Sequence, residues 1–391
     1  MILNEDQIAL RDLTRRFSRE RLLPDYQKRE KVGVLDRQLI REMGGLGLIG
    51  ADLPEKFGGT GVDSVTTGVI AEELAYGDFS IATVSVGASL LGAIIMQSAR
   101  PEVIEEWIPR MISGEAIVGI CVTEPGVGSD AANMKGVRAR RDGDDYVLNG
   151  EKTSITFAEY ADAFLVFART GKPQDGARGV SAFFVPRDSK GVSTLRFDDL
   201  GSIIIGRGSV FLDDVRIPAN HLLAEEGQGF TQVMMGFDYS RALIGLKCVG
   251  AAQASLDESW AYTQERQAFG GPIAQFQGVT FPLVDGETHI AAVRQLCYHT
   301  LALRDAKQPH TAEAAMCKWI GPRTAFDVIH QCLLTVGHYG YSKDLPHQQR
   351  LRDVMGLEIG DGTAGVMKMI IARERVGRAA VQYSKQLYCS K

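Results

Sequence analysis

The chain has 391 residues, of which 45% are apolar and 23% are charged, and its formal net charge is -5. This is the composition of an ordinary globular protein, and the length suffices for two or three folding units that each bury a core. A nucleic-acid-binding surface normally requires clustered Lys and Arg, so the acidic balance predicts no nucleic-acid partner.

No segment has the pattern of a targeting signal or a membrane anchor. Charged residues interrupt the first 21 positions, whereas a secretory signal needs an unbroken apolar stretch. The longest apolar run, 88–96, is interrupted by Ser89 and Gly92 and is much shorter than the roughly 18 residues of a membrane span. We therefore expect a cytoplasmic protein with no membrane partner.

The cysteines indicate buried free thiols rather than disulfides or metal ligands. They form no CxxC pair and share no zinc-ligand spacing with His, so no metal site is expected. The six positions are Cys121, Cys248, Cys297, Cys317, Cys332 and Cys389.

The hydrophobic pattern of residues 1–117 is helical. Leu10, Leu13 and Phe17 recur at three- and four-residue spacing, which places them on one face of a helix. A turn-rich segment, 54–61, contains one proline and three glycines and separates two helical parts. We expect an N-terminal helical domain over this range.

The pattern changes twice after that point. Residues 118–225 contain short apolar runs, such as 164–167 and 182–185, that are bounded by Gly, Pro, Asp and Asn and predict a small antiparallel sandwich or barrel. Residues 226–391 return to helical spacing, which includes the run 366–380 near the C-terminus. The predicted fold class is mainly α with a central β domain.

The string CVTEPGVGSD at 121–130 is the most specific local motif. It predicts a strand that runs into a glycine-rich turn, because Pro125 ends the ladder and Gly126 and Gly128 let backbone approach a ligand closely. Its hydroxyl and N–H groups could hold a polar ring edge or a phosphate. Composition alone favours an ordinary turn, since glycine-rich turns are common.

This segment resembles the flavin-binding signature of the acyl-CoA dehydrogenases, and the similarity covers nearly the whole chain. Further matches follow in order at 54–61, at 149–152 (NGEK), at 211–218 (FLDDVRIP), at 265–270 (ERQAFG) and at 351–353 (LRD). The resemblance implies FAD as cofactor, an acyl-CoA substrate and a fold with an N-terminal helical domain, a central β domain and a C-terminal four-helix bundle. That fold agrees with the hydrophobic pattern.

The resemblance also assigns binding positions. Those that would contact the flavin are Ile120, Cys121, Val122, Thr123, Gly128, Ser129, Ile155, Thr156 and Thr363. Those that would reach the FAD of a neighbouring subunit, and so imply a homo-oligomer, usually a tetramer, are Arg266, Phe269, Gln277, Leu334, Gly337 and His338. Those that would receive the substrate and its CoA arm are Ser129, Phe237, Asp238, Arg241, Gly362 and Arg373.

Structural roles are the alternative for the charged members of these sets. Arg266 alone is typical of a surface ion pair. Asp238 and Arg241 stand three residues apart on a predicted helix, so they could simply pair with each other for a few tenths of a kcal/mol.

The reaction that the resemblance implies needs a base beside the α carbon of a thioester and hydrogen-bond donors on its carbonyl. The family commonly has a Glu in a string ending Glu-Gly-Thr, whereas this chain has IGDGT at 359–363, with one methylene less. Some relatives carry the Glu one residue before the CoA-binding Arg, where this chain has Ser240. We therefore expect Asp361 to be the base and the flavin to accept the hydride. The alternative is that Asp361 only caps or turns the chain.

The shorter side chain bears on the substrate. Proton transfer needs roughly hydrogen-bond contact between the base and the α carbon. Because Asp is shorter than Glu, the α carbon must lie closer to the backbone of residue 361 than it would if this residue were Glu. Ser154 also stands where many relatives have a bulky aromatic residue near the flavin. Both departures favour a branched or alicyclic acyl group, such as cyclohexane-1-carboxyl-CoA.

Three other functions fit the family pattern. A nitroalkane oxidase-like enzyme also uses Asp at this position, and an acyl-carrier-protein-linked dehydrogenase would take a protein-bound acyl group. Nucleic-acid-associated relatives carry an added basic C-terminal region, which this sequence does not show. For a dehydrogenase, the electron acceptor that the resemblance implies is an electron-transfer flavoprotein.

Overall fold

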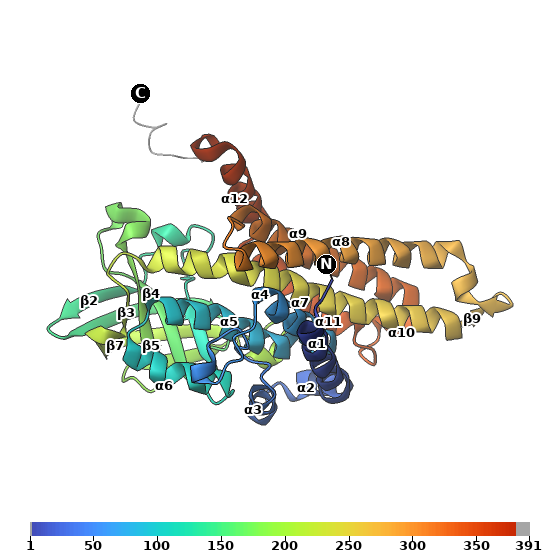
Figure 1. Cartoon of the computed structure of the whole chain (residues 1–391), viewed down its shortest axis with the longest axis horizontal. Coiled ribbons are helices and arrows are strands. Elements are labelled where there is room, and N and C mark those ends of the chain that lie inside the picture. The colour runs from blue at the N-terminus through green and yellow to red at the C-terminus, as the bar shows by residue number, and fades with distance from the viewer. Residues whose placement is uncertain (1, 381–391) are drawn as a thin grey trace.

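The computed structural model describes residues 2–380, in which a helical region, a β-sheet and a second helical region follow one another (Figure 1). The predicted mainly α fold with a central β domain is confirmed. The first region holds α1 (Glu5–Phe17), α2 (Tyr26–Val32), α3 (Arg37–Gly45), α4 (Ser64–Gly77), α5 (Phe79–Ser98) and α6 (Pro101–Ile112). The last region holds α7 (Gly229–Glu265), α8 (Gln277–Asp305), α9 (Thr311–Val336), α10 (His338–Tyr341), α11 (His347–Ile359) and α12 (Ala364–Val376).

Side-chain caps explain where several helices begin. Asp36, Asp63 and Asp78 accept hydrogen bonds from backbone N–H groups in the first turns of α3, α4 and α5. Thr363 does the same for Val366 at the start of α12. Each cap satisfies a helix N–H that would otherwise lack a partner and stabilises the helix by about 1 kcal/mol.

Helix α5 is more apolar than the sequence pattern suggested. It contains an 18-residue window with a mean hydropathy of 2.0, which is long and apolar enough to cross a membrane. The expectation that no segment approaches this length was therefore wrong, because isolated Ser and Gly residues do not offset the surrounding aliphatic side chains. In the fold 78% of the window is buried, and α5 packs against α4, α7 and β1 as a core helix.

One sheet of eight strands forms the central region, in the order β6-β7-β3-β2-β4-β5-β8, and β1 pairs with β4. Most neighbours are antiparallel as expected, but β1 runs parallel to β4 and β2 meets β4 in parallel at one residue pair. The strands are β1 (Val118–Cys121), β2 (Arg138–Asp142), β3 (Asp145–Ile155), β4 (Ala163–Arg169), β5 (Val180–Pro186), β6 (Val192–Arg196), β7 (Gly208–Pro218) and β8 (Leu222–Leu223). A separate hairpin joins β9 (Gln267–Ala268) and β10 (Gly271–Pro272).

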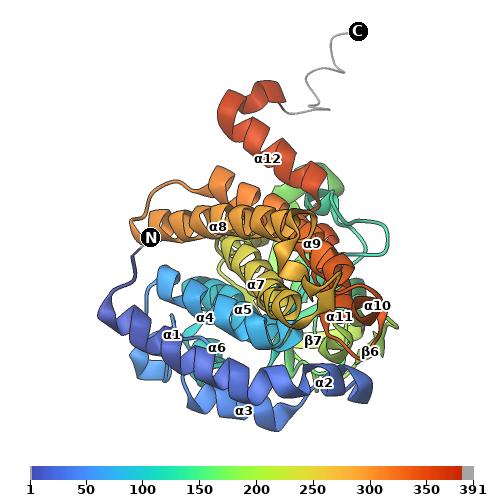
Figure 2. The same ribbon diagram turned by 90° about the vertical axis from the view of Figure 1, so that its right-hand side faces the viewer.

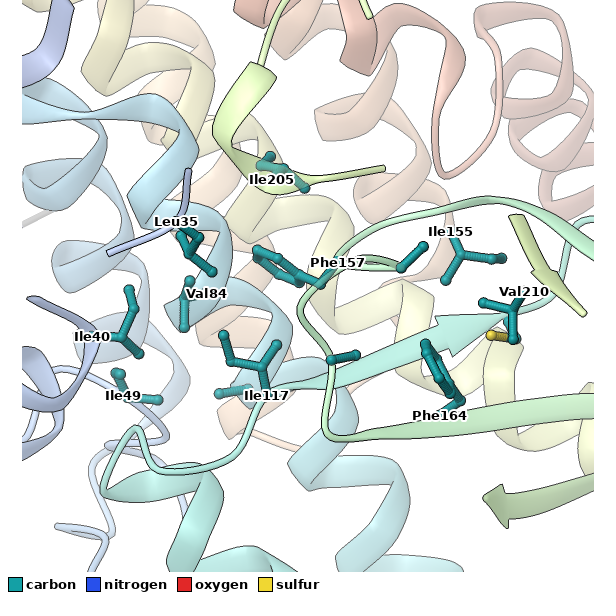
Figure 3. Packing of buried hydrophobic residues seen from close by; sticks show 14 of the residues in the cluster. Leu35, Ile40, Ile49, Val84, Ile117, Ile155, Phe157, Phe164, Ile205 and Val210 are labelled. Carbon is teal, nitrogen blue, oxygen red and sulfur yellow. The ribbon is translucent and has the colours of Figure 1, made fainter. Parts of the chain in front are cut away.

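A large hydrophobic cluster connects the first helices to the sheet (Figure 3). Leu35, Ile40 and Val84 of the helical region lie in the same cluster as Ile155 and Phe164 of the strands, and all five are buried. Burying one such side chain contributes roughly 1.5–3 kcal/mol. The shared core therefore holds α5 in a defined position beside the end of β3.

The C-terminal bundle is built around α7, α8, α9 and α11 (Figure 2). Gly245 of α7 and Gly321 of α9 permit close approach of the two helices, since a Cβ on Gly321 would lie 2.8 Å from the Cα of Gly245. Helix α12 packs on α9, but both views show it projecting away from the bundle, and Met367 is its only buried residue.

The cysteines within the described residues are all free and buried, as predicted. They are Cys121, Cys248, Cys297, Cys317 and Cys332. Cys389 lies outside the described residues.

Asp353 of α11 joins all three regions. Its carboxylate accepts a hydrogen bond from the Tyr26 hydroxyl at 2.5 Å and another from the Ser202 N–H at 2.5 Å. Burial raises the pKa of Asp353 to about 7, although both hydrogen bonds act in the opposite direction. The folded protein therefore binds this proton more tightly than the unfolded chain does.

We expect the contribution of Asp353 to the free energy of unfolding to fall, by roughly 4 kcal/mol at most, as the pH rises from about 4 to about 7. Asp353→Asn cannot ionise and loses one of the two acceptors, so the stability of the wild type relative to this variant should decline over that interval. Chemical denaturation at a series of pH values measures the difference. The exposed Asp188→Asn is the control, and an Asp353→Asn difference that stays constant with pH would contradict the assignment.

Candidate active site

The glycine-rich motif forms a projecting turn at the end of β1. The backbone of Glu124 and that of Val127 exchange two hydrogen bonds of 3.0 and 2.9 Å, which closes the turn. Gly126 and Gly128 are exposed, and no atom lies within 4 Å of the place where a Cβ would stand on either residue. The predicted strand and turn are confirmed, and the backbone of this loop is open to a ligand.

A buried ion pair fixes this loop to the sheet. Lys152 donates to Glu124 Oε1 at 2.9 Å and to the Val122 carbonyl at 2.8 Å. Glu124 also accepts three backbone N–H hydrogen bonds of 2.6–2.9 Å from residues 135–137. Burial alone would raise the pKa of Glu124, but Lys152 and these N–H groups outweigh it and hold the pKa below its usual value.

The end of β3 lies against the same loop. The Thr153 N–H donates to the Thr123 carbonyl at 2.9 Å, which places Thr123 next to the last residues of β3. The backbone at Ser154 is left-handed, with φ of 60°, a conformation that costs energy in a residue other than glycine and is often found at functional sites.

Four hydroxyl groups around this corner lack hydrogen-bond partners within residues 2–380: those of Thr123, Ser129, Ser154 and Thr156. The side chains of Cys121 and Ile155 instead point into the core and are 0% and 2% exposed. Any contact that these two residues make with a flavin must therefore come from their backbone. Ile120 is partly exposed, and Val122 is buried in the cluster that also contains Phe237.

Asp361 lies in the short connection between α11 and α12. It is partly exposed and left-handed, with φ of 55°, and Gly362 follows with φ of 105°. Thr363, not Asp361, caps α12, so the capping alternative is wrong for this helix. Within the described part of the chain the Asp361 carboxylate accepts no hydrogen bond.

Three buried cations interact electrostatically with Asp361. Lys318 of α9 donates to the carbonyls of Leu357 and Gly362, the latter at 3.1 Å, and so holds the loop against the bundle. Burial lowers the pKa values of Lys318, Arg241 and Lys247, while the negative charge of Asp361 raises all three. Asp361 therefore lies within electrostatic range of Arg241 and Lys247 of α7.

The predicted CoA-binding residues on α7 interact with one another. Arg241 donates to Asp238 Oδ1 at 2.8 Å, and Thr311 donates to Asp238 Oδ2 at 2.7 Å. The ion pair between Asp238 and Arg241, which is the structural alternative to a role in CoA binding, is therefore present in this structure. Arg241 Nε remains buried without a hydrogen-bond partner among the described residues, which leaves one donor for a ligand. Arg373 is half-exposed, and its positive charge further lowers the pKa of Arg241.

The residues predicted to reach a neighbouring FAD lie elsewhere. Phe269, at the tip of the β9–β10 hairpin, is 97% exposed, and Figure 1 shows this hairpin at the opposite end of the molecule from the sheet. Arg266 and Gln277 flank it and are exposed as well. Exposed Leu334, Gly337 and His338 lie where α9 ends and α10 begins. The structure thus separates these residues from the flavin loop of the same chain.

Two features of the site had no counterpart in the sequence-based prediction. The Lys152–Glu124 pair joins residues 28 positions apart, which lie in two separate matched strings, 121–130 and 149–152, and neither string indicates that the two side chains pair. Lys247 and Lys318 are charged residues within apolar helical stretches. A charged residue in an otherwise apolar stretch was the feature of the sequence from which both lysines could have been recognised.

The corner formed by residues 120–129 and 154–156 fits a flavin. It offers glycine backbone with open space beside it, unpartnered hydroxyl groups for the polar edge of a ring, and partly exposed aliphatic surface at Ile120. The fold and this corner are those expected of a flavin-dependent oxidoreductase.

Comparison with known proteins gives the family. The acyl-CoA dehydrogenase N-terminal, middle and C-terminal domains match residues 4–115, 119–215 and 227–375. A probable acyl-CoA dehydrogenase of Bacillus subtilis is 35% identical over 378 residues, which cover 95% of this chain and 98% of the relative. The chain belongs to the acyl-CoA dehydrogenase family, whose members are FAD-dependent oxidoreductases acting on CH–CH bonds.

Solved structures agree with this assignment. Butyryl-CoA dehydrogenase of Megasphaera elsdenii superposes with a TM-score of 0.92 at 30% identity, over 96% of this chain and 99% of that one. A glutaryl-CoA dehydrogenase of Mycobacterium smegmatis in complex with FADH2 superposes with a TM-score of 0.91 at 28% identity, over 97% of each chain.

Proposed function

We propose that this protein introduces an α,β double bond into an acyl-CoA, with Asp361 as the base that removes the α proton. The observation that supports this most directly is the carboxylate of Asp361, presented on a left-handed turn with no hydrogen-bond partner among residues 2–380. Such a carboxylate is free to approach a substrate proton. FAD, when bound, supplies the acceptor for the hydride that leaves the β carbon.

The chain's own residues would deliver and orient the thioester. Phe237, Asp238 and Arg241 lie on one face of α7, and Arg241 Nε has a hydrogen bond to give. Ser129 of the glycine-rich loop, Gly362 and Arg373 complete the proposed path of the CoA arm. The Asp361 N–H has no acceptor among the described residues, so it can donate to the thioester carbonyl as negative charge develops there.

For the acyl group we propose a branched or alicyclic skeleton, such as cyclohexane-1-carboxyl-CoA. The support is the short arm of Asp361 together with the small, exposed side chain of Ser154 at the flavin corner. A ring or branch at the α carbon fills the width that Ser154 leaves and brings the α hydrogen toward the shorter carboxylate.

Steady-state assays with a panel of acyl-CoA thioesters test the proposed skeleton of the acyl group. With an artificial electron acceptor, we expect cyclohexane-1-carboxyl-CoA to have a specificity constant at least tenfold above those of butyryl-CoA and octanoyl-CoA, about 1.4 kcal/mol in transition-state binding. Ser154→Tyr should reduce that preference by narrowing the corner. A higher specificity constant for either straight-chain thioester in the wild type would rule out the alicyclic proposal.

We also propose a homotetramer in the cytoplasm that passes electrons to an electron-transfer flavoprotein. The support is the exposed apolar surface at the far end of the bundle, which includes Phe269, Phe281, Leu334 and Tyr341. Exposed patches of this kind mark interfaces between proteins. In a tetramer, Arg266, Phe269, Gln277, Leu334, Gly337 and His338 would contact the FAD of a second subunit.

Two alternatives have simple tests. Oxygen consumption with nitroethane would indicate nitroalkane oxidase-like chemistry, which shares an Asp base. A response to acyl groups on acyl carrier protein with none to the matching CoA thioesters would indicate a carrier-protein-linked dehydrogenase.

A further inference from the structure

Lys247 is a buried cation that forms no salt bridge within the described residues. It lies in the middle of α7, is 2% exposed, and forms no salt bridge with any residue of the described range 2–380. Its ammonium group donates to Thr83 Oγ1 at 2.5 Å and lies 3.8 Å from the centre of the Phe79 ring, both on α5. Asp353, Asp361 and Asp78 act on this charge, but none of them forms a salt bridge with it within the described residues. A hydroxyl and a ring face leave a buried ammonium only partly compensated, and a charge in that position normally has a negative partner in direct contact.

Open space lies beside the partner of Lys247. Helix α5 is buried over most of its length, yet Thr83 is partly exposed. Gly87 lies one turn further along the helix, and no atom stands within 4 Å of the position that its Cβ would occupy. Positions 83 and 87 share one face of a helix. The open space at Gly87 therefore lies on the same face of α5 as Thr83, which accepts the hydrogen bond of Lys247.

Helix α7 runs from the proposed reaction centre to Lys247. Phe237 packs in the cluster that contains Val122 of the flavin loop, and Lys247 follows nearly three turns later on the helix face that also carries Ser240 and Ile244. At 1.5 Å per residue, Lys247 lies about 9 Å along the axis beyond Arg241. An acyl group that has its α carbon at Asp361 and runs away from the CoA-binding residues therefore extends toward Lys247.

We propose that Lys247 binds a carboxylate at the end of the acyl group remote from the thioester, so that the substrate is the CoA ester of a dicarboxylic acid. This rests on the dehydrogenase function proposed above and adds a distal carboxylate to its substrate. It predicts that an acyl group with such a carboxylate is preferred over the matched neutral acyl group, whether the skeleton is straight, branched or alicyclic. Thr83 is a positioning residue, because its hydroxyl directs the ammonium group. A charge-assisted hydrogen bond to a carboxylate supplies the direct negative partner that the described residues do not provide.

The test compares two thioesters of matched shape. Glutaryl-CoA carries the distal carboxylate, and in 5-methylhexanoyl-CoA two methyl groups replace its oxygens. In the wild type we expect glutaryl-CoA to have the higher specificity constant for flavin reduction. In Lys247→Met, which keeps the length of the side chain but removes its charge, the ratio of the two constants should fall at least 100-fold. Thr83→Val should lower the ratio about tenfold.

Equilibrium binding provides a readout without turnover. The dissociation constants of the enoyl products, glutaconyl-CoA and 5-methyl-2-hexenoyl-CoA, should show the same loss of discrimination in Lys247→Met by calorimetry. Lys190 is exposed, so Lys190→Met is the control and should leave the ratio of specificity constants and the ratio of dissociation constants unchanged. The FAD content and the melting temperature of each variant show whether it is folded.

The outcomes separate the two proposals. If the wild type prefers the neutral thioester, or if Lys247→Met keeps the wild-type ratio, the carboxylate site is wrong while the dehydrogenase function stands. If no acyl-CoA reduces the flavin of the wild type, both proposals fail.

Discussion

Asp361→Asn is expected to slow the reduction of bound FAD by acyl-CoA by about 10³-fold, within the range that a positioned general base contributes. Asparagine keeps the size of the side chain and its left-handed backbone tolerance but cannot accept the α proton. Asp361→Ala should give a similar loss. Stopped-flow absorbance of the flavin measures the rate of its reduction directly. Without oxygen or another electron acceptor, the reduced flavin is not reoxidised during the measurement.

Asp361→Glu is the informative control. It restores the base that the family commonly carries and adds one methylene. We expect it to retain substantial activity and to shift preference toward straight-chain thioesters, because the carboxylate then reaches further. Near-wild-type flavin reduction in both Asp361→Asn and Asp361→Ala would remove Asp361 from the mechanism.

Breaking the Glu124–Lys152 pair is expected to have the second large effect. Lys152 is 0% exposed and Glu124 is 3% exposed, so Glu124→Gln leaves a buried ammonium without its counter-charge. Removing one partner of a buried pair typically destabilises a protein by about 3–5 kcal/mol. Because this pair fixes the glycine-rich loop, the variant should also purify with little FAD. Absorbance of the purified protein and thermal unfolding with added FAD measure the two effects.

The double variant Glu124→Gln/Lys152→Met separates charge from shape. It removes both charges, so we expect part of the stability and FAD content lost in Glu124→Gln to return. If Glu124→Gln alone binds FAD and unfolds like the wild type, the loop does not depend on this ion pair.

The sequence predicts those parts of the fold that depend on local pattern. Periodicity located both helical regions and the runs that became β4 and β5, and Pro125 with its glycines marked the turn after β1. These elements follow from the spacing of apolar residues and from backbone preferences, which are properties of a few neighbouring residues. The assignment of individual site residues came instead from resemblance to the family.

Contacts between distant segments could not be predicted from the sequence pattern. The parallel pairing of β1 with β4, the Asp353 link to Tyr26 and Ser202, and the Lys152–Glu124 pair each join parts of the chain that no local pattern relates. The side-chain direction at Cys121 depends likewise on which face of the strand meets the core. Partners for buried charges are set by tertiary packing, so only the structure could identify Lys247 as lacking one.

Exchange of the α hydrogen with solvent tests the central claim, that Asp361 removes this proton beside the flavin. An acyl-CoA with sulfur in place of the β carbon, such as 3-thiahexanoyl-CoA, can lose its α proton but has no β hydride to transfer. In deuterium oxide, the FAD-loaded wild type should incorporate deuterium at the α carbon, as followed by NMR, and Asp361→Asn should do so about 10³-fold more slowly. Equal exchange rates for the two proteins would contradict the assignment of Asp361 as the base.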